Sequence, residues 1–153
     1  MKIKAVLAVL ASASVLTLSA CGSNSSDVPK GPISEARTHA FKSMLLEFGQ
    51  MGKIVKGDDT YDIAKFKQLA STFTEKSKEP FKHFQSDSQG NGDALPAIWQ
   101  KPDDFKTKEA QFHAAVDKLN AAAQSGNLDQ IKATYGETGS TCKACHKEFR
   151  RPE

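Results

Sequence analysis

The chain has 153 residues, of which 39% are hydrophobic and 25% charged, and a formal net charge of +3. This length suits a single domain and is too short for two domains of ordinary size. The small net charge gives no reason to expect a nucleic-acid partner. No Gly-rich phosphate loop, Ser/His/Asp arrangement or spaced carboxylate pair is evident, so the sequence indicates a protein that is not an enzyme.

The first 20 residues have the pattern of a secretory signal peptide, which is cleaved. Two lysines precede an uncharged stretch over 5–20, which is shorter than the ~20 residues that a membrane-spanning helix needs. The stretch ends in LSAC at 18–21 and resembles the lipobox of bacterial lipoproteins. That resemblance implies a lipid on Cys21 and, because Gly22 follows rather than Asp, sorting to the outer membrane. The alternative is ordinary cleavage that leaves Cys21 as a free thiol.

Residues 21–32 are expected to be the lipidated cysteine and a flexible tether, since GSNSSDVPKGP at 22–32 is small, polar and rich in Pro and Gly. The folded domain is expected over 33–153. Its apolar residues recur at three- and four-residue spacing, which predicts helices and no strand. The second helix is expected to start near Asp59 or Tyr61, with Pro80 kinking or interrupting it. The expected bounds of the four helices are 33–56, 59–84, 102–126 and 128–149.

A loop over 86–102, rich in Gly, Asp and Pro, is expected between the second and third helices, and it contains the only tryptophan, Trp99. The fourth helix carries an unbroken apolar stripe on the side that faces the rest of the domain. Gly139 lies on this stripe and has no side chain to crowd a flat ligand. Four amphipathic helices with short links predict an all-α, antiparallel four-helix bundle. The stripe consists of Leu128, Ile131, Tyr135, Thr138, Cys142, Cys145 and Phe149.

The run CKACH at 142–146 is the attachment motif of a c-type haem. Cys142 and Cys145 would bind the porphyrin covalently, and His146 would coordinate the iron. A thioredoxin-like redox pair needs a βαβ context, and a zinc site needs four ligands, so both alternatives fit less well. With Cys21 carrying lipid, none of the three cysteines is left for a disulfide.

The chain resembles cytochrome c′, the class II c-type cytochromes, over nearly the whole predicted domain. The resemblance implies a four-helix bundle with one covalently bound haem c. Class I cytochromes carry the same motif near the N-terminus, whereas here it is near the C-terminus. The residues and segments that carry the resemblance are Arg37, Phe41, Met44, FGQM at 48–51, VKG at 55–57, GDALPAIW at 92–99 and GSTCKACHKEFR at 139–150.

The resemblance also implies roles for single residues. Arg37 matches an arginine that contacts a haem propionate, and Arg150 matches an arginine on the proximal side of the haem. Thr38 stands where the family often has glutamine, and Leu95, with Ala94, lies in the segment that borders the haem edge. For both arginines the alternative is a solvated charge on a helix surface.

By the same resemblance, Phe41 would occupy the distal position, which holds methionine in low-spin electron carriers and a bulky hydrocarbon in cytochromes c′. A phenyl ring cannot coordinate iron, so we expect five-coordinate, high-spin haem in an apolar pocket that binds NO and CO. Met44, one turn further, is expected to flank this pocket; with the helix rotated, its thioether would reach the iron instead.

Two functions follow from these expectations. The first is a gas-binding haem protein at the periplasmic side of the bacterial cell envelope, with a role in NO tolerance. The alternative is a periplasmic electron-transfer cytochrome, for which the sequence identifies no redox partner. An interaction module without haem is a third class. The resemblance further implies a homodimer formed through the first helix.

Overall fold

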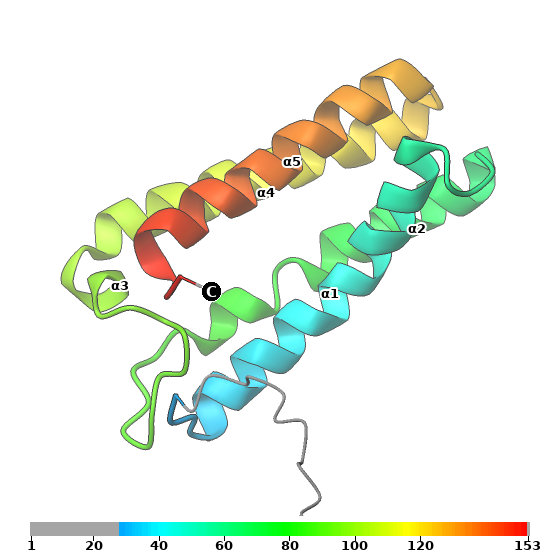
Figure 1. The fold of residues 1–153 in the computed structure, drawn as a ribbon. Helices are drawn as coiled ribbons and strands as arrows, with labels where there is room; N and C mark the ends of the chain where they lie inside the picture. Colours follow the sequence, from blue (N-terminus) through cyan, green and yellow to red (C-terminus); the bar gives the residue numbers. More distant parts are fainter. Residues whose placement is uncertain (1–27, 153) are drawn as a thin grey trace, which may run out of the picture.

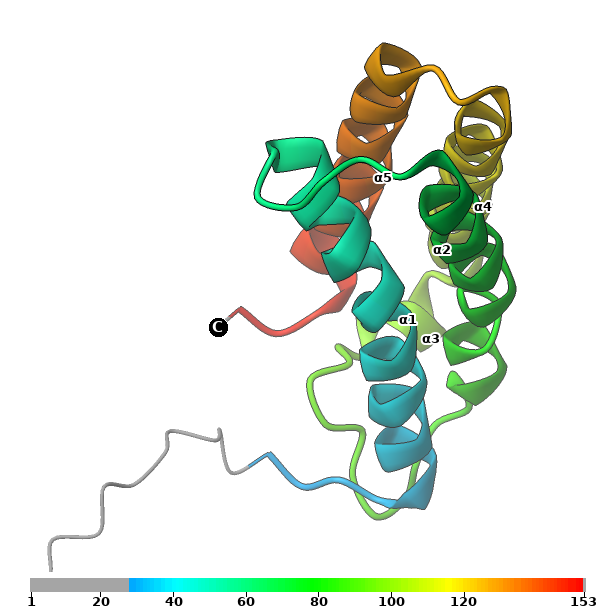
Figure 2. The ribbon, with the colours of Figure 1, turned by 90° about the vertical axis from the view of Figure 1, so that its right-hand side faces the viewer.

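The computed structural model describes residues 28–152. The predicted signal peptide and Cys21 lie outside the described residues. Figure 1 shows two long pairs of helices lying side by side, one formed by α1 and α2 and the other by α4 and α5. Figure 2 shows the same four elements after a turn of 90° about the vertical axis. No β-strand occurs within 28–152, so the predicted all-α four-helix bundle is confirmed.

The first pair is formed by α1 (Pro32–Lys56) and α2 (Ile63–Lys76). Proline at the start of α1 suits a position whose amide would have no partner in the helix. Gly57 ends α1 in the left-handed conformation at φ 86°, which glycine adopts without steric cost. The carboxylate of Asp62 caps α2 by accepting a hydrogen bond from the Lys65 amide at 2.7 Å. With this cap α2 starts at Ile63, slightly later than the expected start near Asp59 or Tyr61.

The second expected helix does not continue to Phe84. It ends at Lys76, and a separate 3-10 turn, η1 (Pro80–His83), follows. Pro80 has no amide hydrogen, and its ring would collide with the carbonyl of residue 76 if the α-helix continued. The predicted interruption is therefore confirmed, but it begins before the proline.

The second pair is formed by α4 (Pro102–Ser125) and α5 (Leu128–Phe149), close to their expected bounds. Gly126 ends α4 at φ 73°, and the Asn127 side chain caps α5 by accepting the amides of Asp129 and Gln130. The expected loop over 86–102 contains one short helix that the sequence did not indicate, α3 (Ala97–Gln100). Within 28–152 no helix is both long enough and apolar enough to cross a membrane.

The main core lies between the four long helices, with fully buried Met51, Phe66, Leu119 and Ile131 among its members. A second cluster of Ile98, Phe105 and Phe149 lies where α3, α4 and the end of α5 meet. The folded part begins before Ile33, because Gly92 donates to the Pro29 carbonyl at 3.0 Å and Gly31 donates to the Gly90 carbonyl at 2.9 Å. Pro29 and Gly31, which were expected in the tether, therefore belong to the folded part.

Candidate functional site

Cys142 and Cys145 lie one turn apart on α5, and each thiol packs against apolar side chains. Cys142 adjoins the main core, whose neighbouring members include Phe41, and Cys145 adjoins the second cluster. The sequence prediction that this stripe of α5 faces the other helices is confirmed by the burial of Ile131, Thr138 and Phe149 along it.

Both thiols are partly withdrawn from water, which disfavours the thiolate. Burial raises the pKa of Cys142. Burial, followed by the proximity of Cys142, raises the pKa of Cys145 to about 11. Cysteines used as nucleophiles or redox switches typically have lowered pKa values. The two thiols therefore do not have the character of a thioredoxin-like pair.

The surroundings of the two thiols fit an apolar macrocycle. Five aromatic rings adjoin the same two apolar clusters as the thiols and are only partly buried. A flat apolar group bound at the thiols would cover this surface and gain the free energy of removing it from water. On the same stripe, a Cβ atom added at Gly139 would approach no atom more closely than Phe48 Cζ at 3.9 Å. The five rings are those of Phe41, Phe48, Phe81, Phe84 and Tyr135.

His146 lies near the C-terminal end of α5 and is exposed, and its carbonyl accepts the Arg150 amide at 3.1 Å. The loop with Ala94 and Leu95, which the resemblance places at the haem edge, also contacts the C-terminal end of α5. Leu95 donates its amide to the Phe149 carbonyl at 3.0 Å, and Ala94 forms an antiparallel bridge with Arg150. The structure thus brings Leu95, His146 and Arg150 together at one end of α5.

Arg37 is only 5% exposed and is held by η1 and by the loop that follows it. Its Nη1 donates to the His83 carbonyl at 2.8 Å and its Nη2 to the Asn91 carbonyl at 2.6 Å. Burial lowers the pKa of Arg37, and the negative charge of Asp87 opposes this effect. A guanidinium has five N–H donors, so these two bonds leave donors for a carboxylate ligand. The solvated-charge alternative does not describe Arg37.

The other first-helix candidates have different environments. Thr38 donates its hydroxyl to the Ser34 carbonyl at 2.8 Å, one turn earlier in α1. Phe41 is half-buried and meets the rings of Phe81 and Phe84 edge-on. Met44 is 3% exposed and belongs to the main core.

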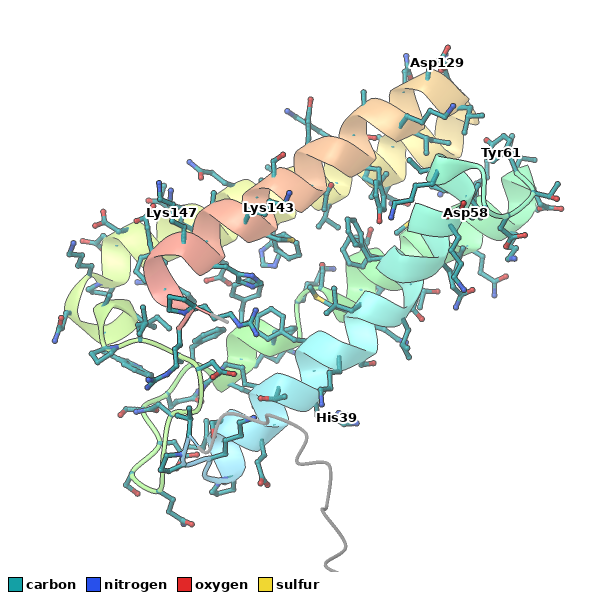
Figure 3. The ribbon with its side chains drawn as sticks, viewed as in Figure 1. His39, Asp58, Tyr61, Asp129, Lys143 and Lys147 are labelled. Carbon is teal, nitrogen blue, oxygen red and sulfur yellow. The ribbon has the colours of Figure 1, made fainter. Side chains whose placement is uncertain are left out.

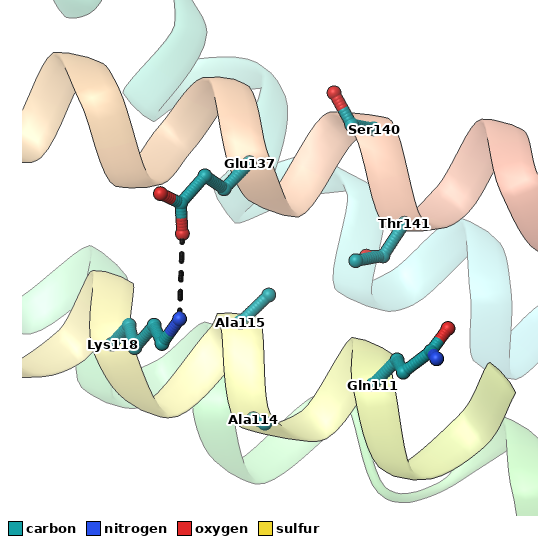
Figure 4. Close-up of a pocket in the computed structure, with 7 residues that line it drawn as sticks. All are labelled: Gln111, Ala114, Ala115, Lys118, Glu137, Ser140 and Thr141. Atoms are coloured by element: carbon teal, nitrogen blue, oxygen red, sulfur yellow. Dashed lines mark ion pairs between the residues drawn. The ribbon is translucent and has the colours of Figure 1, made fainter. Parts of the chain in front are cut away.

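One groove on the described surface lies away from the thiols. It lies between α4 and α5, with a volume of about 490 Å³, and Lys118 and Glu137 approach to 3.8 Å across it (Figure 4). Neither Cys142 nor Cys145 lines it. Lys143 and Lys147 are exposed on the outer side of α5 (Figure 3). The residues of 28–152 gather no group of three or more His, Cys, Asp or Glu side chains fit for a metal ion, so the zinc alternative gains no further ligand there.

Sequence reasoning missed three residues that shape this region. Phe81 and Phe84 were expected at the end of the second helix, but they lie in and just after the separate turn η1, where their rings contact Phe41. Asp87 was expected only as part of the polar loop. It is 5% exposed, and its carboxylate accepts hydrogen bonds from two backbone amides of α1. The repeated phenylalanines after Pro80 were the only sequence signal for these ring contacts. No neighbouring residue in the sequence indicated the role of Asp87.

Three comparisons with known proteins agree. The family model for cytochrome C′ matches residues 33–150. Cytochrome c′ of Alcaligenes xylosoxydans xylosoxydans is 38% identical over 115 residues, which are 75% of this chain and 90% of the relative. Cytochrome c′ of Rubrivivax gelatinosus is 36% identical over 122 residues, which are 78% of this chain and 95% of the relative. A nitric oxide complex of a variant of cytochrome c prime from Alcaligenes xylosoxidans has a TM-score of 0.75 and 36% identity, covering 79% of this chain and 94% of that one.

Proposed function

Because this chain belongs to the cytochrome c′ family, whose members carry one covalently bound haem c, we propose that it binds NO and CO at the bacterial cell envelope and contributes to NO tolerance. Cys142 and Cys145 would hold the haem through thioether bonds, His146 would coordinate the iron, and Arg37 would bind a propionate. Bound there, the haem supplies an iron centre that takes up diatomic gases.

The observation that carries this proposal is the environment of Phe41. This ring adjoins the same apolar core as Cys142 and cannot donate to a metal. Met44, the rival ligand one turn away, is packed in the core at 3% exposure. A site with one protein ligand and an apolar opposite side favours NO and CO over O2, because bound O2 is polar and is stabilised by hydrogen-bond donors. The nitric oxide complex of a related cytochrome c prime supports the same choice of ligand.

The absorption spectrum of the purified holoprotein tests this function. We expect broad high-spin bands in the ferric and ferrous forms, and spectral changes when NO or CO is added. A sharp, split α band in the reduced protein would contradict the proposal, as would a methionine–iron charge-transfer band in the ferric form. Either result would favour the alternative function, a periplasmic electron-transfer cytochrome. Absence of covalent haem after pyridine treatment would favour the third class, an interaction module.

The envelope location rests on the sequence of the leader. Lipid on Cys21 would anchor the protein on the periplasmic side, with outer-membrane sorting favoured by Gly22. This location would place the haem where NO enters the cell. Export also agrees with haem attachment, because bacterial c-type haem is attached outside the cytoplasmic membrane.

Homodimerisation through α1 is part of the same proposal. Leu45 and Leu46 are 49% and 63% exposed on this helix, which is high for leucine side chains. Sedimentation velocity would show a dimer for the wild type and a monomer for Leu46→Glu. A monomeric wild type at micromolar concentration would contradict dimerisation without affecting the gas-binding proposal.

A further inference from the structure

The Phe41 ring is backed by two rings from the connection that follows α2. Its centroid lies 6.1 Å from that of Phe81 and 6.2 Å from that of Phe84, with interplanar angles of 70° and 79°. Edge-to-face pairs at such distances are attractive, because the positive edge of one ring meets the negative face of the other. The orientation of Phe41 therefore depends on residues 80–84, which we call the 80–84 segment.

The 80–84 segment is one 3-10 turn and one further residue, and contacts with distant residues hold it in place. Arg37 Cζ lies 4.9 Å from the centroid of the Phe84 ring, within cation–π distance. Arg37 Nη1 also donates to the His83 carbonyl at 2.8 Å. On the other side, Trp99 Nε1 donates to the Phe84 carbonyl at 2.8 Å. Phe84 is thus held through its ring and through its backbone.

Arg37 and Phe41 are one helical turn apart on α1, and both contact Phe84. Residues four apart lie on the same face of a helix, so α1 contacts Phe84 at two successive turns. A shift of Phe84 would loosen the support of Phe41 and the cation–π contact of Arg37 together. The packing of one side chain therefore connects the residue proposed for the propionate with the residue proposed for the distal face.

We propose that Phe84 is a positioning residue that holds the Phe41 ring and thereby limits the rate at which NO or CO reaches the iron. Arg37 assists by holding Phe84. This inference rests on the proposed function, in which Phe41 lies on the ligand-binding side. It goes beyond that function because Phe84 controls access without itself being the distal residue.

The first test measures the association rate of CO with the reduced holoprotein by stopped flow or flash photolysis. Replacing Phe84 with leucine removes the ring edge, so Phe41 gains freedom to rotate. We expect the association rate of Phe84→Leu to rise about tenfold, which corresponds to about 1.4 kcal/mol in the barrier. Phe84→Tyr keeps the ring and should retain the wild-type rate. A wild-type rate for a folded Phe84→Leu protein would overturn the inference.

The second test does not depend on ligand binding. With ¹³C-labelled phenylalanine, NMR of the diamagnetic ferrous CO form reports how often the Phe41 ring flips. We expect faster flipping in Phe84→Leu and wild-type flipping in Phe84→Tyr. If Phe84→Leu does not fold, Phe84→Met fills a similar volume and carries the same expectations. Unchanged flipping in the folded variant would contradict the positioning role.

Phe66→Leu is the matched control. Phe66 is fully buried, and its ring contacts that of Tyr61, near the α4–α5 connection. This variant should lose stability while keeping the wild-type CO rate. Phe41→Ala separates the two proposals. If it accelerates CO binding and Phe84→Leu does not, only the positioning role fails; if Phe41→Ala leaves the rate unchanged, the distal assignment of Phe41 fails.

Discussion

The carboxylate of Asp87 accepts a hydrogen bond from the Ser34 amide at 3.0 Å, although 53 residues separate the two in sequence. The same oxygen accepts the Ile33 amide at 2.8 Å, and the other oxygen accepts the Gln89 amide at 3.1 Å. The residue before α1 is Gly31, which has no side chain to cap the helix. Asp87 supplies that cap from a distant loop and so fixes the loop to the helix that carries Arg37.

Asp87→Asn should lower the melting temperature by several degrees. The substitution removes a negative charge from the positive end of α1 and replaces one acceptor oxygen with an amide group. Thermal unfolding followed by circular dichroism measures the effect. Asp58→Asn is the control, because Asp58 is exposed after the end of α1 and should tolerate the change. Equal melting temperatures for wild type and Asp87→Asn would contradict the capping role.

The same residue should make stability depend on pH in the acid range. Burial raises the pKa of Asp87. The hydrogen bonds from the amides of Ser34, Gln89 and Ile33, together with the charge of Arg37, lower this pKa by more than burial raises it. The net pKa of Asp87 is therefore below its ordinary value. A carboxyl with a lowered folded-state pKa stabilises the fold above the unfolded-state pKa of about 3.9. That stabilisation is lost as the pH falls through the folded-state value.

We therefore expect wild-type stability to decrease more steeply below about pH 4 than that of Asp87→Asn. Urea unfolding at a series of pH values measures both slopes. Parallel curves for the two proteins would show that Asp87 does not contribute to this acid sensitivity.

Phe41→Met should change the spin state of the iron. If Phe41 faces the iron opposite His146, a methionine there can coordinate it and produce a low-spin spectrum with a split α band. Absorption and electron paramagnetic resonance spectra detect the change. Met44→Leu should leave the spectrum high-spin, because Met44 packs in the core. If Phe41→Met stays high-spin and Met44→Leu has an altered spectrum, the prediction is contradicted, and position 44 rather than position 41 lies on the distal side of the iron.

Gly139→Leu should reduce the amount of covalently attached haem. A side chain at this position would enter the space next to Phe48, on the stripe that carries Cys142 and Cys145. Gly136→Leu is the matched control, since a Cβ there has no atom within 4 Å. Both changes replace glycine in α5, which should favour the helix by about 0.5–1 kcal/mol. The pyridine haemochrome assay measures haem per protein, and equal contents in both variants would contradict the prediction.

Cys21→Ser should release the protein from the membrane fraction. Serine has no sulfur for a diacylglycerol, so the exported protein would lose its proposed anchor. Fractionation of cells, followed by immunoblotting, measures the distribution. Gly22→Asp should keep the anchor but move the protein from the outer to the inner membrane. A soluble wild-type protein would instead support ordinary cleavage with a free Cys21.

The four long helices and most of their ends could be predicted from the sequence, because their causes are local. Gly57 and Gly126 end helices through their own backbone freedom, and Pro102 begins one through its fixed φ. The prediction was wrong about the end of α2, because a pattern of apolar residues continues through Pro80 although the α-helix cannot. The short helix α3 was missed, since a single turn has too few residues to show periodicity.

The sequence by itself determined the haem motif and the class of fold, and its resemblance to the family led to the proposal that Phe41 is the distal residue. The spacing of Cys142, Cys145 and His146 is a property of one helical turn, so it can be read without knowing the fold. The tertiary structure alone decided what holds Phe41 and Arg37. Their partners in the 80–84 segment and around Asp87 are 40–54 residues away in sequence. Such contacts form only when the bundle brings distant segments together, and no local periodicity encodes them.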